Sequence, residues 1–474
     1  MKENKISNIL RCTVFNDLLL KCFFIAATLG TASPFIHIVV APFMKVLLAW
    51  GIILLGYKIC TNWRMYLNKY YILLAAFCVS YGITILLNRG MNFSANMKAL
   101  AYMVVIFGVI FCLDFHKSKE QMIREMKVMT LVFVGVSFLL AAASLYTYVF
   151  SVKGHAMYNG QWVYYGMFEN RLWGLYNPNT GSAINTLTIL LISGYWIFFR
   201  PKRKVMKAFF VINVLCHYFC LLLTNSRTAL YTLIIGVGML IFLSGQYYWH
   251  GERLKVSILL KQAVFALLGC VIVFVSVEPV RAGLSYVPSA VKYVKVNVLG
   301  DEGSGKIEKK ELGRLEEEEE RPGGIFTGRT VLWKAGIDTF KEAPVFGVSR
   351  ENIFERVDRN LHDKYWEKDL ERGGLHNIYL TVLVSSGIVG FVIFIAFIII
   401  YAVKAIRYAF SQKARKENGF VLCLLAISAV QLMMEFLEAR ILYQVGIFYI
   451  IFWCIAGYAL YFIDKPEESK NNEH

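Results

Sequence analysis

The sequence predicts an all-α membrane protein that crosses the bilayer many times. Hydrophobic residues make up 57% of the 474 residues, which is more than soluble domains contain. They fall into long runs of roughly the 20 residues that a membrane-spanning helix needs. None of these runs has the alternating pattern of a membrane β-barrel strand.

Twelve apolar runs are interpreted as spans, at residues 17–33, 36–57, 70–87, 97–115, 128–150, 180–199, 205–224, 227–245, 258–277, 378–403, 419–437 and 441–463. Lysine and arginine are concentrated in alternate connectors, within 58–69, 117–127, 200–207, 253–261 and 404–416. Cytoplasmic connectors carry this excess of positive charge, so both termini are placed in the cytoplasm. The first run resembles a signal peptide, but eleven spans follow it, and we interpret it as a retained helix.

The net charge of +17 reports this orientation and some attraction to anionic lipid. Residues 278–376 contain 17 lysines and arginines against 19 acidic residues, a net charge of −2. The basic excess therefore lies in the membrane part of the chain. A nucleic-acid partner is not expected.

The runs divide the chain into nine helices, a long outer segment and three further helices. The predicted boundaries are 1–150 for helices 1–5, 151–179 for an aromatic outer loop, 180–277 for helices 6–9, 278–376 for a large extracytoplasmic loop, 377–463 for helices 10–12 and 464–474 for a cytoplasmic tail. Within the large loop, residues 296–327 are rich in Gly and Glu and are expected to be flexible. Residues 328–342 have helical periodicity and predict an amphipathic helix against the membrane or the bundle. A second short helix is predicted at 350–359.

Polar residues gather where three of the helices begin, and the topology places all three starts on the outer face. The clusters are Tyr176 to Asn179, Asn225 to Thr228 and Leu375 to Tyr379. Three polar helix starts on one face predict a functional site.

Three arginines are candidate anion ligands. Arg227 follows the capping residues Asn225 and Ser226, and a guanidinium at a helix N-terminus suits a phosphate group. Snorkelling of Arg227 to the interface is an equally good explanation. Arg329 begins the amphipathic helix, where the alternative is surface charge. Arg171 lies near the first cluster and is a possible second contact for the anion.

The remaining candidates have ordinary structural explanations beside the functional one. Asn177 and Asn179 flank Pro178 and fit the chemistry of a turn and a helix cap. His376 can take a proton from a hydroxyl near neutral pH, or can simply bond the backbone at the interface. Asn377 and Tyr379 follow it at the same helix start. No Cys/His spacing predicts a zinc site, there is no Asp-x-Asp pair, and no metal or cofactor is expected.

Taken in order, five strings make the chain similar to the O-antigen ligase and Wzy-type polysaccharide polymerase family. They are Trp173 to Asn179, Ser226 to Thr228, Gly328 to Trp333, Ala343 to Gly347, and His376 to Leu380 with Gly387 to Gly390. The second half of the chain carries the resemblance best. Ser349 and the pair Ser385 and Ser386 depart from the family pattern and leave the subfamily open.

The resemblance implies a GT-C-like membrane enzyme in the bacterial cytoplasmic membrane, with its active site on the extracytoplasmic side. It implies metal-independent, inverting transfer from an undecaprenyl-pyrophosphate-linked oligosaccharide. In that reaction Arg227 and Arg329 would bind the diphosphate, with Arg171 as a weaker third, and His376 would accept or orient the acceptor hydroxyl. Asn177, Asn179, Ser226, Asn377 and Tyr379 would contact substrate. A flippase and a chain-length regulator are the partners that the family implies.

Three functions stay open at this point. The first is a polymerase that joins lipid-linked repeat units into a capsular or O-antigen-like polysaccharide. The second is a ligase that moves finished glycan to another acceptor. The third, of another class, is a transporter or flippase of lipid-linked oligosaccharide, which predicts polar residues deep in the bundle and a pseudo-repeat between its halves.

Overall fold

The structure is a computed structural model of the chain, and it describes residues 10, 12–111, 113–158, 161–249, 254–299, 306–312, 328–416 and 419–465. Within these residues, ten helices are long and apolar enough to cross a membrane. Every one of the twelve predicted runs contains a helix. Three of these helices have fewer than 18 residues: α2 (Asp17–Thr31) has 15, α18 (Gly419–Met434) has 16, and α5 (Phe93–Val105) has 13 but reaches 18 together with the π-helix that follows it. The predicted class, an all-α polytopic membrane protein, is confirmed.

The bundle consists of α2 (Asp17–Thr31), α3 (Pro34–Asn62), α4 (Lys69–Leu87), α5 (Phe93–Val105), α6 (Lys119–Val149), α7 (Pro178–Phe199), α8 (Lys204–Leu223), α9 (Arg227–Tyr248), α10 (Val256–Leu284), α16 (Ile378–Ala409), α18 (Gly419–Met434) and α19 (Ile447–Asp464). Short elements extend it: the 3₁₀-helix η1 (Trp63–Leu67), the π-helix η2 (Ile106–Ile110) and α17 (Gln412–Lys416).

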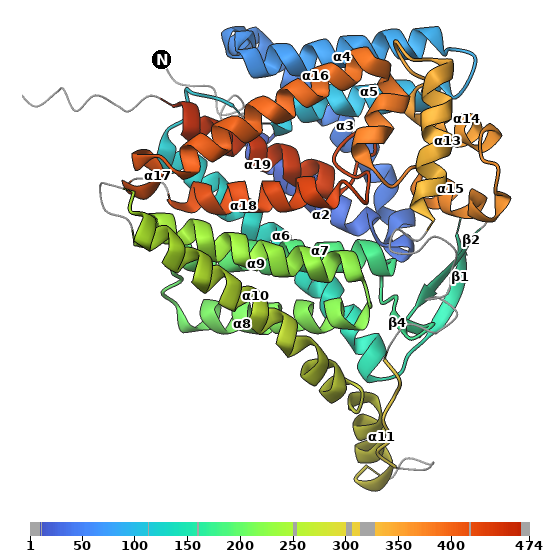
Figure 1. Cartoon of the computed structure of the whole chain (residues 1–474), viewed down its shortest axis with the longest axis vertical. Helices are drawn as coiled ribbons and strands as arrows, with labels where there is room; N and C mark the ends of the chain where they lie inside the picture. Colours follow the sequence, from blue (N-terminus) through green and yellow to red (C-terminus); the bar gives the residue numbers. More distant parts are fainter. Residues whose placement is uncertain are drawn as a thin grey trace, which may run out of the picture.

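The outer segments carry their own short elements. The predicted aromatic loop forms two antiparallel hairpins, β1 (Gly154–Tyr158) with β2 (Gln161–Tyr165) and β3 (Met167–Phe168) with β4 (Arg171–Leu172). The large loop contains α11 (Val287–Asn297), α13 (Arg329–Glu342), η4 (Arg350–Asn352), α14 (Ile353–Arg359), η5 (Lys364–Trp366) and α15 (Glu367–Gly373). Both predicted helices of this loop are therefore present. In Figure 1 the hairpins and α13 to α15 gather at one end of the bundle, and α17 lies at the other.

The flexible stretch predicted at 296–327 lies largely outside the described residues. Its first residues belong to α11 and the turn that follows it, and 306–312 have no regular structure. The preceding helix α10 ends at Leu284 and so extends beyond the predicted span 258–277. Helix α11 follows it after a short break.

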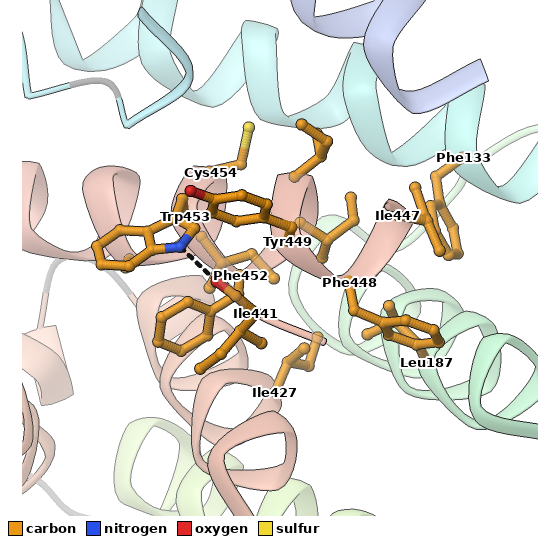
Figure 2. Packing of buried hydrophobic residues seen from close by; sticks show 14 of the residues in the cluster. Phe133, Leu187, Ile427, Ile441, Ile447, Phe448, Tyr449, Phe452, Trp453 and Cys454 are labelled. Carbon is orange, nitrogen blue, oxygen red and sulfur yellow. Dashed lines mark hydrogen bonds between the residues drawn. The ribbon is translucent and has the colours of Figure 1, made fainter. Parts of the chain in front are cut away.

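The last helix is the centre of the bundle. Every residue of α19 from Ile447 to Phe462 is buried, so this helix has no polar face and packs on all sides. Figure 2 shows its aromatic and aliphatic side chains among those of the neighbouring helices. Trp453 Nε1 donates a hydrogen bond of 2.8 Å to the Ile441 carbonyl. This bond ties the loop that precedes α19 to the core of the bundle.

A network of charges joins the helix ends away from the hairpins. The Asp17 carboxylate pairs with Lys58 at 2.9 Å and with Lys117 at 2.8 Å. Lys117 also pairs with Glu125 at 2.8 Å, and the fully buried Lys21 lies 3.4 Å from Asp17. Buried charges are tolerated when they are paired in this way, and the network holds α2, α3 and α6 together.

Helix α16 is broken at Gly387, where φ is +63° and ψ is −170°. The segment after α13 fills the break. Its carbonyl groups at Pro344 and Val345 accept from Ile388 N at 2.8 Å and Val389 N at 3.3 Å. In return, Val348 N donates to the Val384 carbonyl at 3.0 Å. A broken helix is tolerated at membrane depth when neighbouring backbone satisfies the freed groups, so two of the family-like strings form one joint.

Substitution of Gly387 is therefore expected to destabilise the protein. A Cβ at this position would lie 2.2 Å from the Val345 carbonyl oxygen, and backbone angles of this kind, which essentially only glycine adopts, cost another residue about 1–3 kcal/mol. We expect Gly387→Ala to lower the thermal unfolding temperature of the purified protein. Gly56→Ala in α3 is the control, because a Cβ there would meet nothing within 4 Å. Equal unfolding temperatures for both variants would contradict the joint.

Candidate active site

Four charged or titratable side chains meet at the end of the bundle that carries the hairpins and α13 to α15 (Figure 1). The Glu438 carboxylate lies 3.1 Å from Arg440 Nη2, 3.6 Å from His376 Nδ1 and 3.7 Å from Arg329 Nη2. Arg329 begins α13, His376 lies just before α16, and the other two belong to the loop between α18 and α19. The structure thus brings two of the three predicted catalytic residues together around an acid that the sequence analysis did not select. We call these four residues the Glu438 cluster.

The loop of Glu438 is held by backbone contacts on both sides. The Glu435 carbonyl accepts from Ile378 N at 2.9 Å, which fixes the loop to the start of α16. The Glu435 carboxylate accepts from Arg440 N at 2.7 Å, and so it closes the turn that carries Glu438. Together with the hydrogen bond from Trp453, these contacts fix the loop that carries the acid to the start of α16 and to α19.

Gly373 leaves room for the imidazole of His376. A Cβ at this position would lie 2.1 Å from Nε2 and 2.0 Å from Cε1 of that ring. Nδ1 faces Glu438 at a distance slightly longer than a hydrogen bond. The ring therefore turns Nδ1 toward the acid and keeps Nε2 beside a residue without a side chain.

Charge stabilises the ionised form of Glu438. Burial alone raises the pKa of its carboxyl group, but the positive charge of Arg440, with contributions from His376 and Arg329, lowers that pKa to about 2. Burial likewise lowers the pKa of Arg329, and the carboxylate opposes that shift. Two guanidinium groups and one carboxylate leave a net charge of +1 when the imidazole is neutral. The cluster can therefore still attract an anion.

A second polar group forms where β4, α7 and α9 meet. Arg171 donates from Nε to the Thr224 carbonyl at 2.9 Å and from Nη2 to Asn179 Oδ1 at 3.0 Å. Asn177 caps α7, since its Oδ1 accepts from Asn179 N at 3.0 Å. Asn225 Nδ2 donates to the Asn170 carbonyl at 2.8 Å. The adjacent residues Asn170 and Arg171 thus join two of the three predicted polar helix starts, through Asn179 and Asn225.

Arg227 lies at the first position of α9 and is exposed, and the N-cap before it is the buried Ser226. Contacts between α9 and α18 determine at which end of the bundle Arg227 lies. Gly419 packs on Tyr247, and Gly236 packs on Val430, so the two helices run antiparallel with a constant register. The start of α9 therefore lies at the same end of the bundle as the loop that follows α18 and carries Glu438.

Two predicted substrate ligands have structural contacts. Asn377 caps α16, because its Oδ1 accepts from Leu380 N at 2.9 Å, and its Nδ2 donates to the Phe436 carbonyl at 3.2 Å. The Tyr379 hydroxyl donates to the Leu432 carbonyl at 3.1 Å. Both side chains attach α16 to the end of α18 and thereby fix the position of His376. Contact with substrate stays a prediction for both.

Polar side chains also lie deeper in the bundle. His217 Nδ1 in α8 is 2.7 Å from Asn185 Oδ1 in α7, and both side chains are buried. Asn213, one turn before His217, donates to the Val134 carbonyl at 3.3 Å. This is the feature that the transporter alternative predicts. His217 Nδ1 and Asn213 Nδ2 bond to neighbouring helices in this way, as buried polar groups in a bundle commonly do. His217 Nε2 and Asn213 Oδ1 are buried without a hydrogen-bond partner in the described part of the chain.

The fold and the site define a multi-pass membrane protein with a charged site at one end of a helix bundle. Residues 212–395, from within α8 to within α16, match the family described as O-antigen ligase. The match supports an O-antigen ligase type of protein, and that family implies a membrane enzyme of the glycosyltransferase type that acts on lipid-linked glycans. The match includes Arg227, Arg329 and His376 and ends before Glu438. None of the curated proteins matches the chain.

The space beside His376 provides a test of the site geometry. We expect Gly373→Ala to displace the imidazole and to reduce glycan transfer strongly, with little change in thermal stability, because the clash is with the end of a side chain that can rotate. Transfer and unfolding temperature are measured on the same purified sample. Gly446→Ala in the neighbouring loop is the control, since a Cβ there would meet nothing within 4 Å. Wild-type activity in Gly373→Ala would remove His376 from the proposed chemistry.

Proposed function

We propose that the Glu438 cluster catalyses glycosyl transfer from a lipid-linked diphosphate glycan to the hydroxyl of an acceptor sugar. The observation that supports this most is the convergence of Arg329, His376 and Arg440 on Glu438, at the end of the bundle that carries the hairpins and the outer helices. One base and two fixed cations are the groups that such a transfer needs. The enzyme would polymerise repeat units of a surface polysaccharide.

In the proposed reaction His376 Nε2 accepts the proton of the acceptor hydroxyl. The oxygen then attacks the anomeric carbon from the face opposite the diphosphate, and a new glycosidic bond forms as the bond from carbon to phosphate oxygen breaks. The electron pair leaves with the lipid diphosphate, and the configuration at the anomeric carbon inverts. The charge that develops on the leaving group is met by Arg329 and Arg440, with Arg227 at the N-terminus of α9.

Glu438 is a positioning residue in this scheme. Its carboxylate faces Nδ1 of His376, so it favours the tautomer in which Nδ1 carries the hydrogen and Nε2 is free to accept a proton. It also balances the two guanidinium groups while no diphosphate is bound. Without such a partner, two arginines at a buried site would repel each other.

Loss of a cation or of the base is expected to stop transfer without unfolding the protein. We predict that Arg329→Ala and His376→Ala each reduce transfer by about 100-fold or more, the effect typical of an electrostatic group or a general base. Arg359→Ala and His362→Ala are matched controls, because both residues are exposed in the same outer segment. Transfer is measured with purified protein and lipid-linked donor. Full activity in both site variants would end the proposal.

The same variants separate polymerase from ligase. A cell whose polymerase is inactive accumulates lipid-linked single repeats, whereas a cell whose ligase is inactive accumulates long lipid-linked polymer. We expect single repeats, analysed by gel electrophoresis and mass spectrometry of the lipid-linked pool. Long lipid-linked chains in His376→Ala cells would assign the chain to ligation.

Glu438→Gln tests the charge of the positioning residue. The variant keeps the shape of the side chain but leaves Arg440 unpaired, which should cost about 2 kcal/mol of stability at neutral pH. Because the folded state lowers the pKa of this carboxyl group, its ionised form stabilises the folded protein. This stabilisation is complete above the unfolded pKa of about 4.3 and is lost as the pH falls toward 2. The difference in unfolding temperature between wild type and variant should therefore narrow in acid. A difference that does not change with pH would contradict this role.

A further inference from the structure

One face of the β1–β2 hairpin is lined by aromatic and apolar side chains that point away from the bundle. The register pairs His155 with Tyr164 and Met157 with Trp162. Since alternate residues of a strand share a face, these four side chains lie on one face of the hairpin. Met157 is 55% exposed and Trp162 is 51% exposed.

The rings of this face continue into a ladder. His155 lies 4.8 Å from Trp162 and 6.2 Å from Tyr164, measured between ring centroids. Tyr164 stacks on Phe168 at 3.9 Å with an interplanar angle of 10°, and it lies 5.5 Å from Trp173. We call His155, Trp162, Tyr164, Phe168 and Trp173 the aromatic ladder.

The opposite face of the hairpin is fixed to the bundle. Tyr165 packs edge-on against Phe35 with centroids 5.5 Å apart, and Tyr158 packs against His37 at the same distance. Both partners belong to the first turn of α3. Because one face is anchored in this way, the aromatic ladder is held facing outward.

The hairpin stands outside the hydrocarbon core of the membrane. In the described part of the chain β1 and β2 pair only with each other, so each has an edge without strand partners. Open sheet edges do not occur in contact with the hydrocarbon of a bilayer, because their backbone groups would go unsatisfied. Figure 1 agrees, since β1 and β2 lie beyond the ends of the helices. The exposed rings therefore face the aqueous side of the membrane.

The aromatic ladder ends at the second polar group of the site. Phe168 is paired with Arg171 in the β3–β4 hairpin, and Arg171 donates to Asn179 at 3.0 Å. Trp173 follows two residues later, and Trp173 N donates to the Gly166 carbonyl at 2.9 Å. A continuous row of rings thus leads from the exposed Trp162 to the start of α7.

We propose that the aromatic ladder is a carbohydrate-binding subsite that stacks the sugar rings of the substrate glycan. A pyranose ring presents an apolar face of C–H groups, and the negative face of an aromatic ring attracts such groups. This inference rests on the proposed function, because it takes the ligand to be the glycan that the Glu438 cluster transfers. The ladder would hold the chain beyond the reacting sugar.

The test uses the full chain in lipid nanodiscs and a soluble oligosaccharide, released by mild acid from the lipid-linked glycans of the same cell. Calorimetry gives the dissociation constant. We expect Trp162→Ala to raise it about tenfold, through the loss of one stacking partner, and Trp162→Phe to restore most of the affinity. Trp63→Ala is the matched control, because Trp63 is 54% exposed and lies in η1, in a connector predicted to be cytoplasmic. An unchanged dissociation constant in Trp162→Ala would overturn the subsite.

A second measurement separates the glycan from the membrane as the occupant. Nanodiscs with brominated lipid chains quench tryptophans that touch the bilayer. The fluorescence of Trp162 is obtained by subtracting the emission of Trp162→Phe from that of the wild type. We expect brominated lipid to leave this difference unchanged. Strong quenching of that emission would assign the aromatic ladder to the membrane interface and overturn the proposal.

Measuring glycan transfer and the dissociation constant in the same variants distinguishes a failure of this inference from a failure of the proposed function. We expect His376→Ala to lose transfer and keep the wild-type dissociation constant, whereas Trp162→Ala shortens the polymer. If His376→Ala retained transfer, the proposed chemistry would fail, and the calorimetry would still decide whether the ladder binds glycan.

Discussion

The candidate site depends on the backbone hydrogen bonds at the break in α16. In a bilayer, a helix can open only where another segment satisfies the freed N–H and carbonyl groups. The segment 344–349 does this around Gly387, and it directly follows α13. The same joint therefore docks α13 on α16 and sets the distance between Arg329 and His376, which lie at the starts of those two helices. A surface loop without such bonds would leave the guanidinium group free to move, and electrostatic catalysis requires fixed charges.

Glu438 reduces the repulsion between the arginines of the cluster when no anion is bound. Cations fixed in a partly buried place repel one another and lose hydration, so a site made only of arginines would be unstable without its ligand. One carboxylate in contact with Arg440 and near Arg329 removes part of that cost. The remaining charge is still positive. In the proposed reaction the diphosphate would compete with the carboxylate for the guanidinium groups, and its departure would return them to Glu438.

Much of the fold follows from the sequence because hydrophobic length and the position of lysine and arginine are local properties. The helices of all twelve apolar runs and the short helix at Arg329 are of this kind. The grouping of side chains around Glu438 is not. In the sequence Glu435 lies within an apolar run and Arg440 is an isolated basic residue, and nothing local shows that the loop between them reaches the start of α16. The β-hairpins were missed for a similar reason, since the aromatic residues of 154–172 indicate an interface as readily as a strand.

The backbone before α9 and α16 shows how the polar helix starts are made. Asn225 has φ of +54° and His376 has φ of +47°, and each is followed directly by the N-cap residue of its helix. Left-handed conformations cost a residue with a side chain about 1–3 kcal/mol and persist where the surroundings impose them. At Asn225 a hydrogen bond to the Asn170 carbonyl compensates. At His376 the structure offers Glu438 and the space beside Gly373, and glycine in its place would relieve the backbone but remove the ring. A strained histidine whose ring packs between Glu438 and Gly373 is the arrangement expected when the placement of the imidazole matters more than the stability of the turn.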